Sequence, residues 1–318
     1  SLLLLCRPVW VRRRCVLRAV AVALVGVMVI RLHVGPLPHG DREGLRVSMI
    51  DVGQGLALAV QGKRGALLVD TGGHFSTRYD PGERIVVPFL VDRGTRRLDA
   101  LLVTHDHLDH AGGAAAVLRE LEVGELWLGP GARKSSRFSE LTDAAVERRV
   151  ALVLAEAGLN GQAGGIPVRV LAPRRFARGA PINDRSVVLR IGSAPTRLLV
   201  TGDLEGRGEA ALLAADAPVR AEALVVGHHG SRDGSTEAFL DEVRPRYGLV
   251  SCGRGNPFGH PHGEVTARFG RRRIPLFRTD RLGLVELSAS GRGWSVRTEL
   301  LAHVDRNEDE REDEDGEQ

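Results

Sequence analysis

Residues 104–113 read Thr-His-Asp-His-Leu-Asp-His-Ala-Gly-Gly and follow directly on a largely apolar run at residues 98–103. Five side chains with metal-binding atoms fall within six residues of this stretch: His105, Asp106, His107, Asp109 and His110. Grouping them costs solvation and brings like charges together unless a cation joins them. Imidazole nitrogens with carboxylate oxygens suit zinc, manganese or iron. The stretch therefore predicts a metal site at the carboxyl end of a strand.

Two further polar motifs also follow apolar runs. The run at 198–200 leads into Thr201-Gly202-Asp203, and the run at 223–226 leads into Gly227-His228-His229-Gly230-Ser231. Layered α/β enzymes place their chemistry at the carboxyl ends of strands, where the scaffold is rigid and the loops vary. We therefore expect Asp203 to reach over the site and bridge two cations. One imidazole of the adjacent histidine pair is expected to bind a cation, and the other to support it or to contact substrate.

Short apolar runs separated by turns continue along the chain and indicate an α/β fold. We expect strands at residues 45–50, 57–60, 66–69, 98–103, 126–128, 151–154, 168–171, 187–191, 198–200, 223–226 and 249–251. We expect helices at residues 111–121 and 237–243.

The chain has 318 residues and is 43% hydrophobic, which is enough for one large domain or two small ones. Aromatic residues make up 4%, so base stacking on an aromatic platform is not an obvious binding mode. Cys6 and Cys15 lie near the N-terminus and Cys252 lies alone in the body, which rules out a disulfide framework there.

Charge is unevenly distributed along the chain. Residues 305–318 hold nine acids and two arginines, a charge of −7. Because the formal net charge of the whole chain is +4, the remaining residues carry +11. A basic body suits a polyanionic partner such as nucleic acid, although a solvated basic surface explains the charge equally well. The acidic tail, taken as residues 301–318, is expected to be disordered.

The first 34 residues differ from the rest, because a basic block at 12–14 precedes an unbroken apolar run at 19–30. Twelve apolar residues are too few to cross a bilayer, so we predict a membrane-associated helix. A signal-like segment or a buried helix are the alternatives. Since the positive block comes first, the body would lie on the outer face of the membrane. Residues 35–44 are expected to form a Pro/Gly linker.

Four motifs occur in the order of the metallo-β-lactamase superfamily: Asp70-Thr71-Gly72, the His-x-His-x-Asp-His run at 105–110, Thr201-Gly202-Asp203, and His228. Further features resemble the C-terminal domain of the competence protein ComEC family: Asp51-Val52-Gly53-Gln54-Gly55, Asn183 with Ser186, His228-His229-Gly230-Ser231, and Asn256 followed by His260-Pro261. That family consists of membrane proteins for DNA uptake, and the domain is regarded as a nuclease. The resemblance implies a four-layer αββα metallo-β-lactamase sandwich at residues 45–300, preceded by the short apolar membrane-associated helix.

Carried over residue by residue, the resemblance implies one or two divalent metal ions, zinc or manganese, and no nucleotide cofactor. The first cation position would use His105, His107 and Asp203. The second would use Asp109, His110, His228 and the bridging Asp203. Behind these ligands, Asp70 and Asp51 would order the loops.

The chain departs from the superfamily pattern at one ligand. Many members carry a further ligating histidine before the bridging aspartate, whereas this chain has no histidine from Ala111 to Gly202. Asn183, Asp184 or Ser186 occupy the corresponding region. The first position would therefore bind its metal weakly, use Asp184, or stay empty until substrate arrives.

The chemistry expected from the resemblance is attack of water on a phosphodiester, because two divalent cations activate water and hold a phosphoryl oxygen. Asp109 would orient the water or accept its proton, and His260, with His229 as second choice, would protonate the leaving group. The substrate phosphate would meet polar side chains that are also common in turns: Asn183, Ser186, Ser231, Ser235, Thr236 and Asn256. Arginines would track the backbone or form a solvated charged face: Arg232, Arg254 and residues 271–273.

Three functions compete. The first is a metal-dependent DNA nuclease connected with DNA uptake (competence), with DNA and a membrane-embedded DNA channel as partners. The second is a hydrolase of small esters or lactones, since the same metal chemistry acts on carbonyl groups. The third is a non-catalytic DNA-docking module whose first metal position has decayed. The missing histidine favours the third, and the otherwise complete ligand set argues against it.

Overall fold

The computed structural model describes residues 44–73, 79–130, 135–163, 165–174 and 181–299. The predicted membrane-associated segment at 1–34, nearly all of the linker and the acidic tail lie outside these residues. Among the helices in the described ranges, none has the length and hydropathy of a membrane span. The chain divides into two compact units. The smaller unit comprises residues 1–41 and 92–94, of which only residues 92–94 are described. The site lies in the larger unit.

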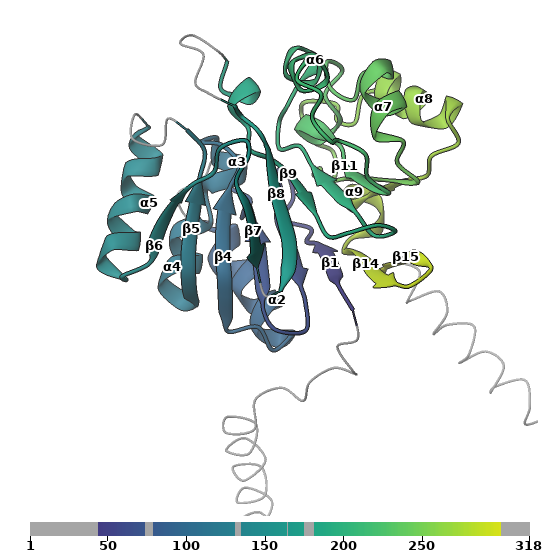
Figure 1. The fold of residues 1–318 in the computed structure, drawn as a ribbon. Coiled ribbons are helices and arrows are strands. Elements are labelled where there is room, and N and C mark those ends of the chain that lie inside the picture. Colours follow the sequence, from purple (N-terminus) through teal and green to yellow (C-terminus); the bar gives the residue numbers. More distant parts are fainter. Residues whose placement is uncertain (1–43, 74–78, 131–134, 164, 175–180, 300–318) are drawn as a thin grey trace, which may run out of the picture. The chain divides into compact units, whose positions relative to one another are not determined.

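Two β-sheets form the centre of the larger unit (Figure 1). Within the described residues the first sheet has eight strands, in the order β15 (Gly293–Thr298), β14 (Val285–Ser290), β1 (Arg46–Met49), β2 (Leu58–Gln61), β3 (Ala66–Val69), β4 (Arg97–Val103), β5 (Glu122–Leu128) and β6 (Ala151–Leu154). The second has seven in the same ranges, in the order β13 (Leu276–Arg278), β12 (Tyr247–Val250), β11 (Ala223–Val225), β10 (Leu198–Val200), β9 (Val188–Ile191), β8 (Ile166–Ala172) and β7 (Asn160–Ala163).

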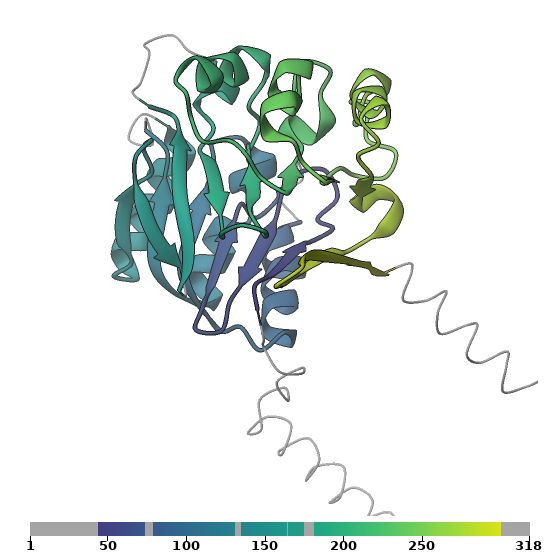
Figure 2. The same ribbon diagram turned by 45° about the vertical axis from the view of Figure 1, so that its right-hand side comes forward.

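Helices lie on the outer faces of both sheets (Figure 2). The elements that precede β10 are the π-helix η1 (Gly82–Val86), α2 (Val87–Asp92), α3 (Leu108–Ala111), α4 (Ala114–Glu120), α5 (Ser136–Glu147) and the 3-10 helix η3 (Asn183–Arg185). Those that follow it are α6 (Gly206–Ala214), the 3-10 segment η4 (Gly227–Gly230), α7 (Glu237–Val243), α8 (Gly263–Arg271) and α9 (Thr279–Leu282).

Strand sequences explain this layering, because side chains alternate between the two faces of a strand. In β3, Leu67 and Val69 belong to the core between the sheets, whereas Ala66 and Leu68 pack towards the helices on the outer face. In β10, Leu199 packs outward in the same way, against the α6 to α8 layer. Strands buried on both faces read as continuous apolar runs, which is how the sequence predicted them. The predicted α/β fold with two sheets is confirmed.

The prediction of a single helix at 111–121 is wrong in one respect. In the structure Gly112-Gly113 separates this segment into the end of α3 and α4. A Cβ on Gly113 would lie 2.7 Å from the carbonyl oxygen of Thr71 and 2.6 Å from the backbone nitrogen of Gly82. This close approach leaves no room for a side chain. It also brings the end of β3 against the start of α4, next to the predicted metal-binding run.

Candidate metal centre

Four chain segments bring the predicted ligands together at one edge of the two sheets. The parallel pair β3 and β4 ends at Asp70 and Thr104-His105, and the parallel pair β10 and β11 ends before Asp203 and η4. His107 precedes α3 in extended conformation, so Asp109 and His110 stand on the first turn of this helix. The carboxyl ends of parallel strands meet at the same edge of a sheet, which explains why residues far apart in sequence converge here.

Asp203 lies at the middle of this group. Its Oδ1 is 2.9 Å from Nε2 of His110 and 3.6 Å from Nε2 of His229. Its Oδ2 is 3.5 Å from Nε2 of His105 and 3.6 Å from Nε2 of His228. The two oxygens of one buried carboxylate therefore face two different pairs of imidazoles.

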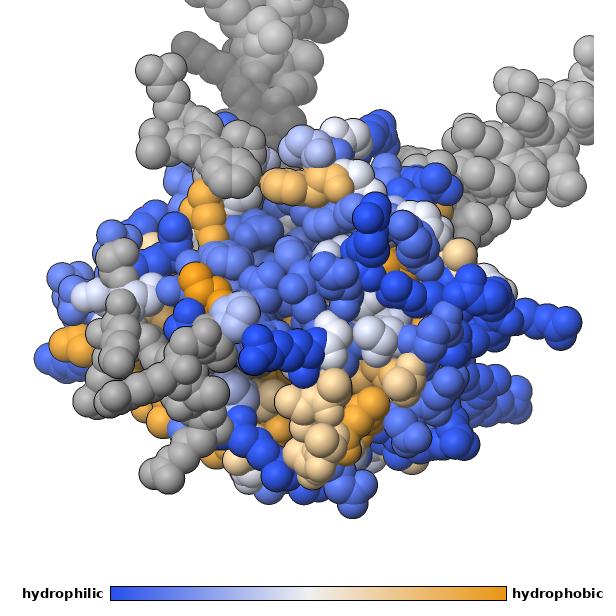
Figure 3. Space-filling model, turned by 90° about the horizontal axis from the view of Figure 1, so that it is seen from above, coloured by the Kyte–Doolittle hydropathy of each residue, from blue (hydrophilic) through white to orange (hydrophobic). Residues whose placement is uncertain are grey.

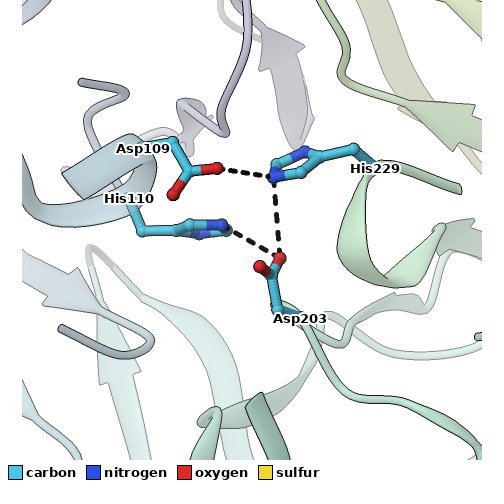
Figure 4. A group of neighbouring side chains, drawn as sticks. All are labelled: Asp109, His110, Asp203 and His229. Carbon is cyan, nitrogen blue, oxygen red and sulfur yellow. Dashed lines mark ion pairs between the residues drawn. The ribbon is translucent and has the colours of Figure 1, made fainter. Parts of the chain in front are cut away.

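Ligand atoms close enough to share one cation form two groups, each with all its atoms within 4.8 Å of one another. One group is His105, His107 and Asp203, and the other is Asp109, His110, Asp203 and His229 (Figure 4). The resemblance placed His228 in the second group, and the structure corrects this. His229 occupies that place, with Nε2 3.2 Å from Oδ2 of Asp109.

The hydrogen bonds made by Nδ1 fix the orientation of these imidazoles. Three histidines donate Nδ1–H to an oxygen that can only accept. His110 donates to Asp70 Oδ2 at 2.7 Å, His229 to Ser251 O at 2.8 Å and His228 to Glu205 Oε1 at 2.7 Å. Nδ1 of His105 lies 3.1 Å from Thr104 Oγ1. Each ring consequently presents Nε2 towards Asp203. Metal-binding histidines in proteins are commonly held in this way by a carboxylate or a carbonyl behind the ring.

Unpaired polar atoms show that the group fits a cation. Within the described part of the chain, Nε2 of His105, His110 and His229 and Oδ1 of Asp203 are buried and lack a hydrogen bond of acceptable geometry. Buried polar atoms normally find partners, because each unpaired one costs about 1–3 kcal/mol. These atoms all point at the two ligand groups, so a divalent cation satisfies them at once. The centre therefore implies divalent metal ions.

Asp70 lies behind the centre and shares its two oxygens among three donors. Oδ1 accepts from Thr104 N at 2.7 Å, and Oδ2 accepts from Thr104 Oγ1 at 2.8 Å and from His110 Nδ1. All of these groups are buried. Asp70 thus fixes both the end of β4 and the tautomer of His110.

We expect Asp70→Asn to weaken metal binding by roughly 10- to 100-fold, the usual effect of changing a residue behind a metal ligand. An amide –NH₂ facing Nδ1–H of His110 turns a hydrogen bond into a repulsion, and the alternative tautomer would put the proton on Nε2. Competition with a chromophoric chelator measures the affinity. An unchanged metal affinity in a folded Asp70→Asn protein would show that this contact has no influence on the centre.

The histidine pair reaches both sides of Asp203 through its backbone conformation. His228 has φ 49° and His229 has φ 55°, both in the left-handed region that non-glycine residues rarely adopt. Such backbone strain occurs where the surrounding structure enforces it, often at functional sites. Glu205, which holds His228, was not predicted. Its position two residues after Asp203 is the only sequence signal for it.

The charged groups of the centre shift one another's pKa values. Burial and the neighbouring His110 lower the pKa of His105. Burial by itself would lower the pKa of His110, but the carboxylates of Asp203 and Asp70 raise it well above its usual value. Burial opposes ionisation of Asp203, yet His110 and His229 hold its pKa well below the usual range. The two carboxylates thus favour the protonated form of His110, whereas a cation needs the neutral imidazole, so metal binding is expected to release a proton.

Several residues predicted to contact substrate are used by the protein itself. Ser186 is buried, and its Oγ accepts from Asp203 N at 3.1 Å. The side chain of Asn256 donates to Gly253 O and His260 O and accepts from His260 N, at 2.8–3.0 Å. Asp51, predicted behind the ligands, instead accepts from Gly53 N within its own turn at 3.1 Å. All three side chains therefore form hydrogen bonds within the protein, and that of Asp51 orders its own turn.

The remaining predicted polar residues lie around His228. Asn183 Nδ2 is 3.4 Å from His228 Nδ1, and Asn183 Oδ1 is buried without a hydrogen bond from the described residues. Ser231 Oγ donates to Glu205 at 3.4 Å. Asp184 faces α6, with Oδ1 3.3 Å from where a Cβ on Gly208 would lie. Asp184 is therefore not placed as the missing ligand.

Ser235 and Thr236 serve the start of α7. Glu209 accepts from both backbone nitrogens and from Thr236 Oγ1, at 2.5–2.8 Å. Thr236 also caps the helix by accepting from Phe239 N. Neither residue is placed to meet the substrate phosphate.

Most of the arginines predicted to follow a nucleic-acid backbone are paired with acids. Arg271 and Arg272 of α8 bind Glu237 of α7, and Arg272 also lies 2.7 Å from Asp241. On the neighbouring turn Arg232 lies 3.1 Å from Glu264. These pairs reduce the positive potential of that face, because opposite charges this close largely cancel at a distance.

The two histidines predicted to protonate the leaving group lie beside the ligand groups. Burial, together with His229 and His228, lowers the pKa of His260 to about 4, so this imidazole is neutral at pH 7. His229 donates through Nδ1 to Ser251 O, and its Nε2 belongs to the second ligand group.

A cavity of about 860 Å³ opens beside the centre. His107, Asp109, Asp203 and His228 line its inner end. The loop at residues 253–258, which contains Arg254, forms one wall. A substrate in this cavity therefore reaches both ligand groups.

Comparisons with known proteins agree with this geometry. Residues 50–254 match the Metallo-beta-lactamase superfamily. ComE operon protein 3 of Bacillus subtilis (strain 168) is 33% identical over 252 residues, which cover 76% of this chain and 32% of that protein. Competence protein ComA of Neisseria gonorrhoeae is 33% identical over 248 residues, which cover 78% of this chain and 32% of that protein. The chain thus spans about a third of the length of these relatives.

Among solved structures, a mutant of the CmlA beta-hydroxylase has a TM-score of 0.50 at 16% identity, covering 79% of this chain and 55% of that one. This likeness concerns the fold alone. The competence relatives confirm the resemblance to proteins of the ComEC type that the motifs predicted. The match over residues 50–254, on a two-sheet α/β fold with its His/Asp centre, shows that the chain belongs to the metallo-β-lactamase superfamily.

Proposed function

We propose that this chain is a metal-dependent nuclease that hydrolyses phosphodiester bonds of DNA. The superfamily fold and the His/Asp centre support metal-dependent hydrolysis. The observation that carries the finer proposal is the position of Asp203, whose two oxygens face two separate sets of ligands. Adjacent cations bridged by one carboxylate suit phosphodiesters, because they can hold the attacked phosphoryl group on both sides.

The first cation, in this proposal, is held by His105, His107 and Oδ2 of Asp203, with His228 approaching from the same side. The second is held by Asp109, His110, His229 and Oδ1 of Asp203. The two ions would supply an activated water and would stabilise the charge that develops on phosphate. Zinc and manganese both suit this donor set of imidazoles and carboxylates.

The surrounding residues hold this arrangement in place. Asp70 orients His110, Ser251 orients His229 and Glu205 orients His228, each through Nδ1. Asp109 Oδ2 lies beside Nε2 of His229 and at the inner end of the cavity. From there it can orient the attacking water or take its proton.

Two observations favour DNA as substrate. Outside the acidic tail the chain carries a formal charge of +11, which attracts polyanions. One of the similar proteins is named competence protein ComA, and by analogy we place this chain in DNA uptake, beside a membrane-embedded DNA channel. The basic block before the apolar run at 19–30 supports membrane association, with the catalytic body on the outer face.

The test is incubation of the whole chain with Mn²⁺ or Zn²⁺ and end-labelled DNA, with EDTA as control. We expect cleavage that requires the metal and that weakens as salt rises, because bound phosphates release counterions. Turnover of ester or lactone substrates without DNA cleavage would overturn the nuclease proposal in favour of a small-molecule hydrolase. DNA binding without cleavage of any substrate would favour a docking module.

A further inference from the structure

Phe258 is an exposed aromatic side chain beside the candidate metal centre. The large hydrophobic side chains that stand exposed in the described ranges are Val146, Leu152, Leu154 and Phe258. The first three belong to α5 and β6, whereas Phe258 lines the cavity and is 48% exposed. Because Phe258 lines the cavity beside the ligand groups, its exposed ring is available to contact a bound molecule.

The loop that carries Phe258, residues 251–262 between β12 and α8, is called the cleft loop here. Asn256 closes it through hydrogen bonds to the backbone of Gly253 and His260. The start of the loop is tied to the opposite turn, because Gly253 N donates to Gln54 Oε1 and Ser251 Oγ donates to Gly55 O. Phe258 is thus presented by a braced loop, which reduces the entropy lost when a ligand binds.

A series of rings connects Phe258 with the metal centre. Phe258 is stacked on His260, with ring centroids 5.7 Å apart and planes at 29°. His260 in turn lies 5.6 Å from His228 and 6.3 Å from His229. Phe258 therefore lies two ring-to-ring steps from the histidines that face Asp203, and a flat group resting on it lies one step further out.

The rest of the cavity wall suits a nucleotide. Arg254, exposed on the cleft loop, supplies a positive charge for a phosphate. Tyr79, Ile85 and Leu108 line the cavity as well and offer apolar contacts. The face seen from above is hydrophilic over most of its area, with apolar side chains in small separate groups (Figure 3). The cavity wall thus combines a positive charge with a limited apolar surface, which suits a nucleotide.

We infer that Phe258 is a stacking platform for a nucleobase of the bound strand. The inference rests on the proposed function and adds a base-binding subsite to it. An aromatic ring can stack only on a base whose face is uncovered, so the subsite takes an unpaired base and is indifferent to its identity. The low aromatic content argued against such a platform, but one well-placed ring is sufficient.

The test compares a single-stranded oligonucleotide with the same strand carrying a central run of abasic spacers, which keep the phosphates and remove the bases. In the wild-type protein, kcat/KM should be higher for the base-bearing strand by roughly 5- to 100-fold, the range expected from stacking one base. Phe258→Ala should remove this preference by slowing cleavage of the base-bearing strand alone, and Phe258→Trp should restore it. Leu154→Ala, which removes a similarly exposed apolar side chain from β6, is the matched control and should change neither rate.

Metal content and melting temperature of Phe258→Ala should equal those of the wild type, which separates lost stacking from a damaged centre. Equal slowing of both strands, or no slowing of either, would overturn the platform. Fluorescence anisotropy with the same strands keeps the two proposals apart. A wild-type protein that binds the base-bearing strand more tightly than the abasic one but cleaves neither would refute the nuclease and leave the platform standing.

Discussion

Replacing Asp203 with alanine is expected to empty both cation positions and to lower DNA cleavage by at least roughly 1,000-fold, or about 4 kcal/mol of transition-state stabilisation. Both oxygens of this buried carboxylate are in use, one towards His110 and His229 and the other towards His105 and His228. Without it the imidazoles face one another with no negative charge between them. Elemental analysis of the purified protein, together with cleavage of labelled DNA, measures both effects.

Asp184→Ala is the matched control, because Asp184 lies in the segment where the missing ligand was expected but faces Gly208 of α6. We expect this variant to keep its metal and its activity. Full metal occupancy in Asp203→Ala, or metal loss in Asp184→Ala, would contradict the assignment of Asp203 as the bridge.

The second large effect concerns the histidine pair. His229→Ala is expected to lose the second cation and to reduce cleavage by roughly 100- to 1,000-fold, because its Nε2 lies among Asp109, His110 and Asp203. His228→Ala is expected to keep the second cation and to weaken the first, with a loss of roughly 10- to 100-fold. Electron paramagnetic resonance after reconstitution with Mn²⁺ shows whether a variant holds neighbouring ions, which give a coupled signal, or a single ion. The anomalous signal of manganese in crystals of each variant then shows which position is empty.

Glu205→Gln provides a milder version of the same experiment, since it removes the charge that holds His228 and leaves His229 untouched. We expect Glu205→Gln, like His228→Ala, to weaken the first cation and to keep the second. The assignment would be wrong if His228→Ala lost the second cation while His229→Ala retained it, which is the arrangement that the superfamily resemblance implied.

The sequence was sufficient to predict most of the sheet structure. Runs such as Ala66–Val69 and Leu198–Val200 are apolar throughout because both faces of these strands are buried between layers, and this pattern is specific for a layered α/β fold. Helix α8 was not predicted. Its buried residues Val265 and Phe269 lie four residues apart, which is helical spacing, so the pattern was present in the sequence but was not used.

The ligand types could be predicted, but the partition between His228 and His229 could not. Adjacent residues normally point in different directions, and which ring reaches which oxygen depends on two consecutive left-handed backbone conformations. The sequence alone does not predict that two consecutive histidines adopt the left-handed conformation. The enforcing contacts, from Glu205 and Ser251, come from other segments of the chain.

Several residues predicted to bind substrate form contacts within the protein that residue type alone could not reveal. Ser186 and Asn256 have the hydrogen-bonding groups that a phosphate needs, but backbone groups nearby already occupy them. Arg271 and Arg272 are cationic, but α7 brings Glu237 against them. Tertiary structure decides which polar side chains form hydrogen bonds or ion pairs within the protein. A prediction from residue type alone therefore overestimates how many polar groups remain for substrate.

The most direct test of the central claim is a crystal structure of the protein grown with Mn²⁺, with diffraction data recorded at a wavelength that reveals the anomalous signal of manganese. We expect two peaks, one on each side of the Asp203 carboxylate, the first among His105, His107 and His228 and the second among Asp109, His110 and His229. A map with no peak within bonding distance of Asp203, at a manganese concentration that supports DNA cleavage, would contradict the account.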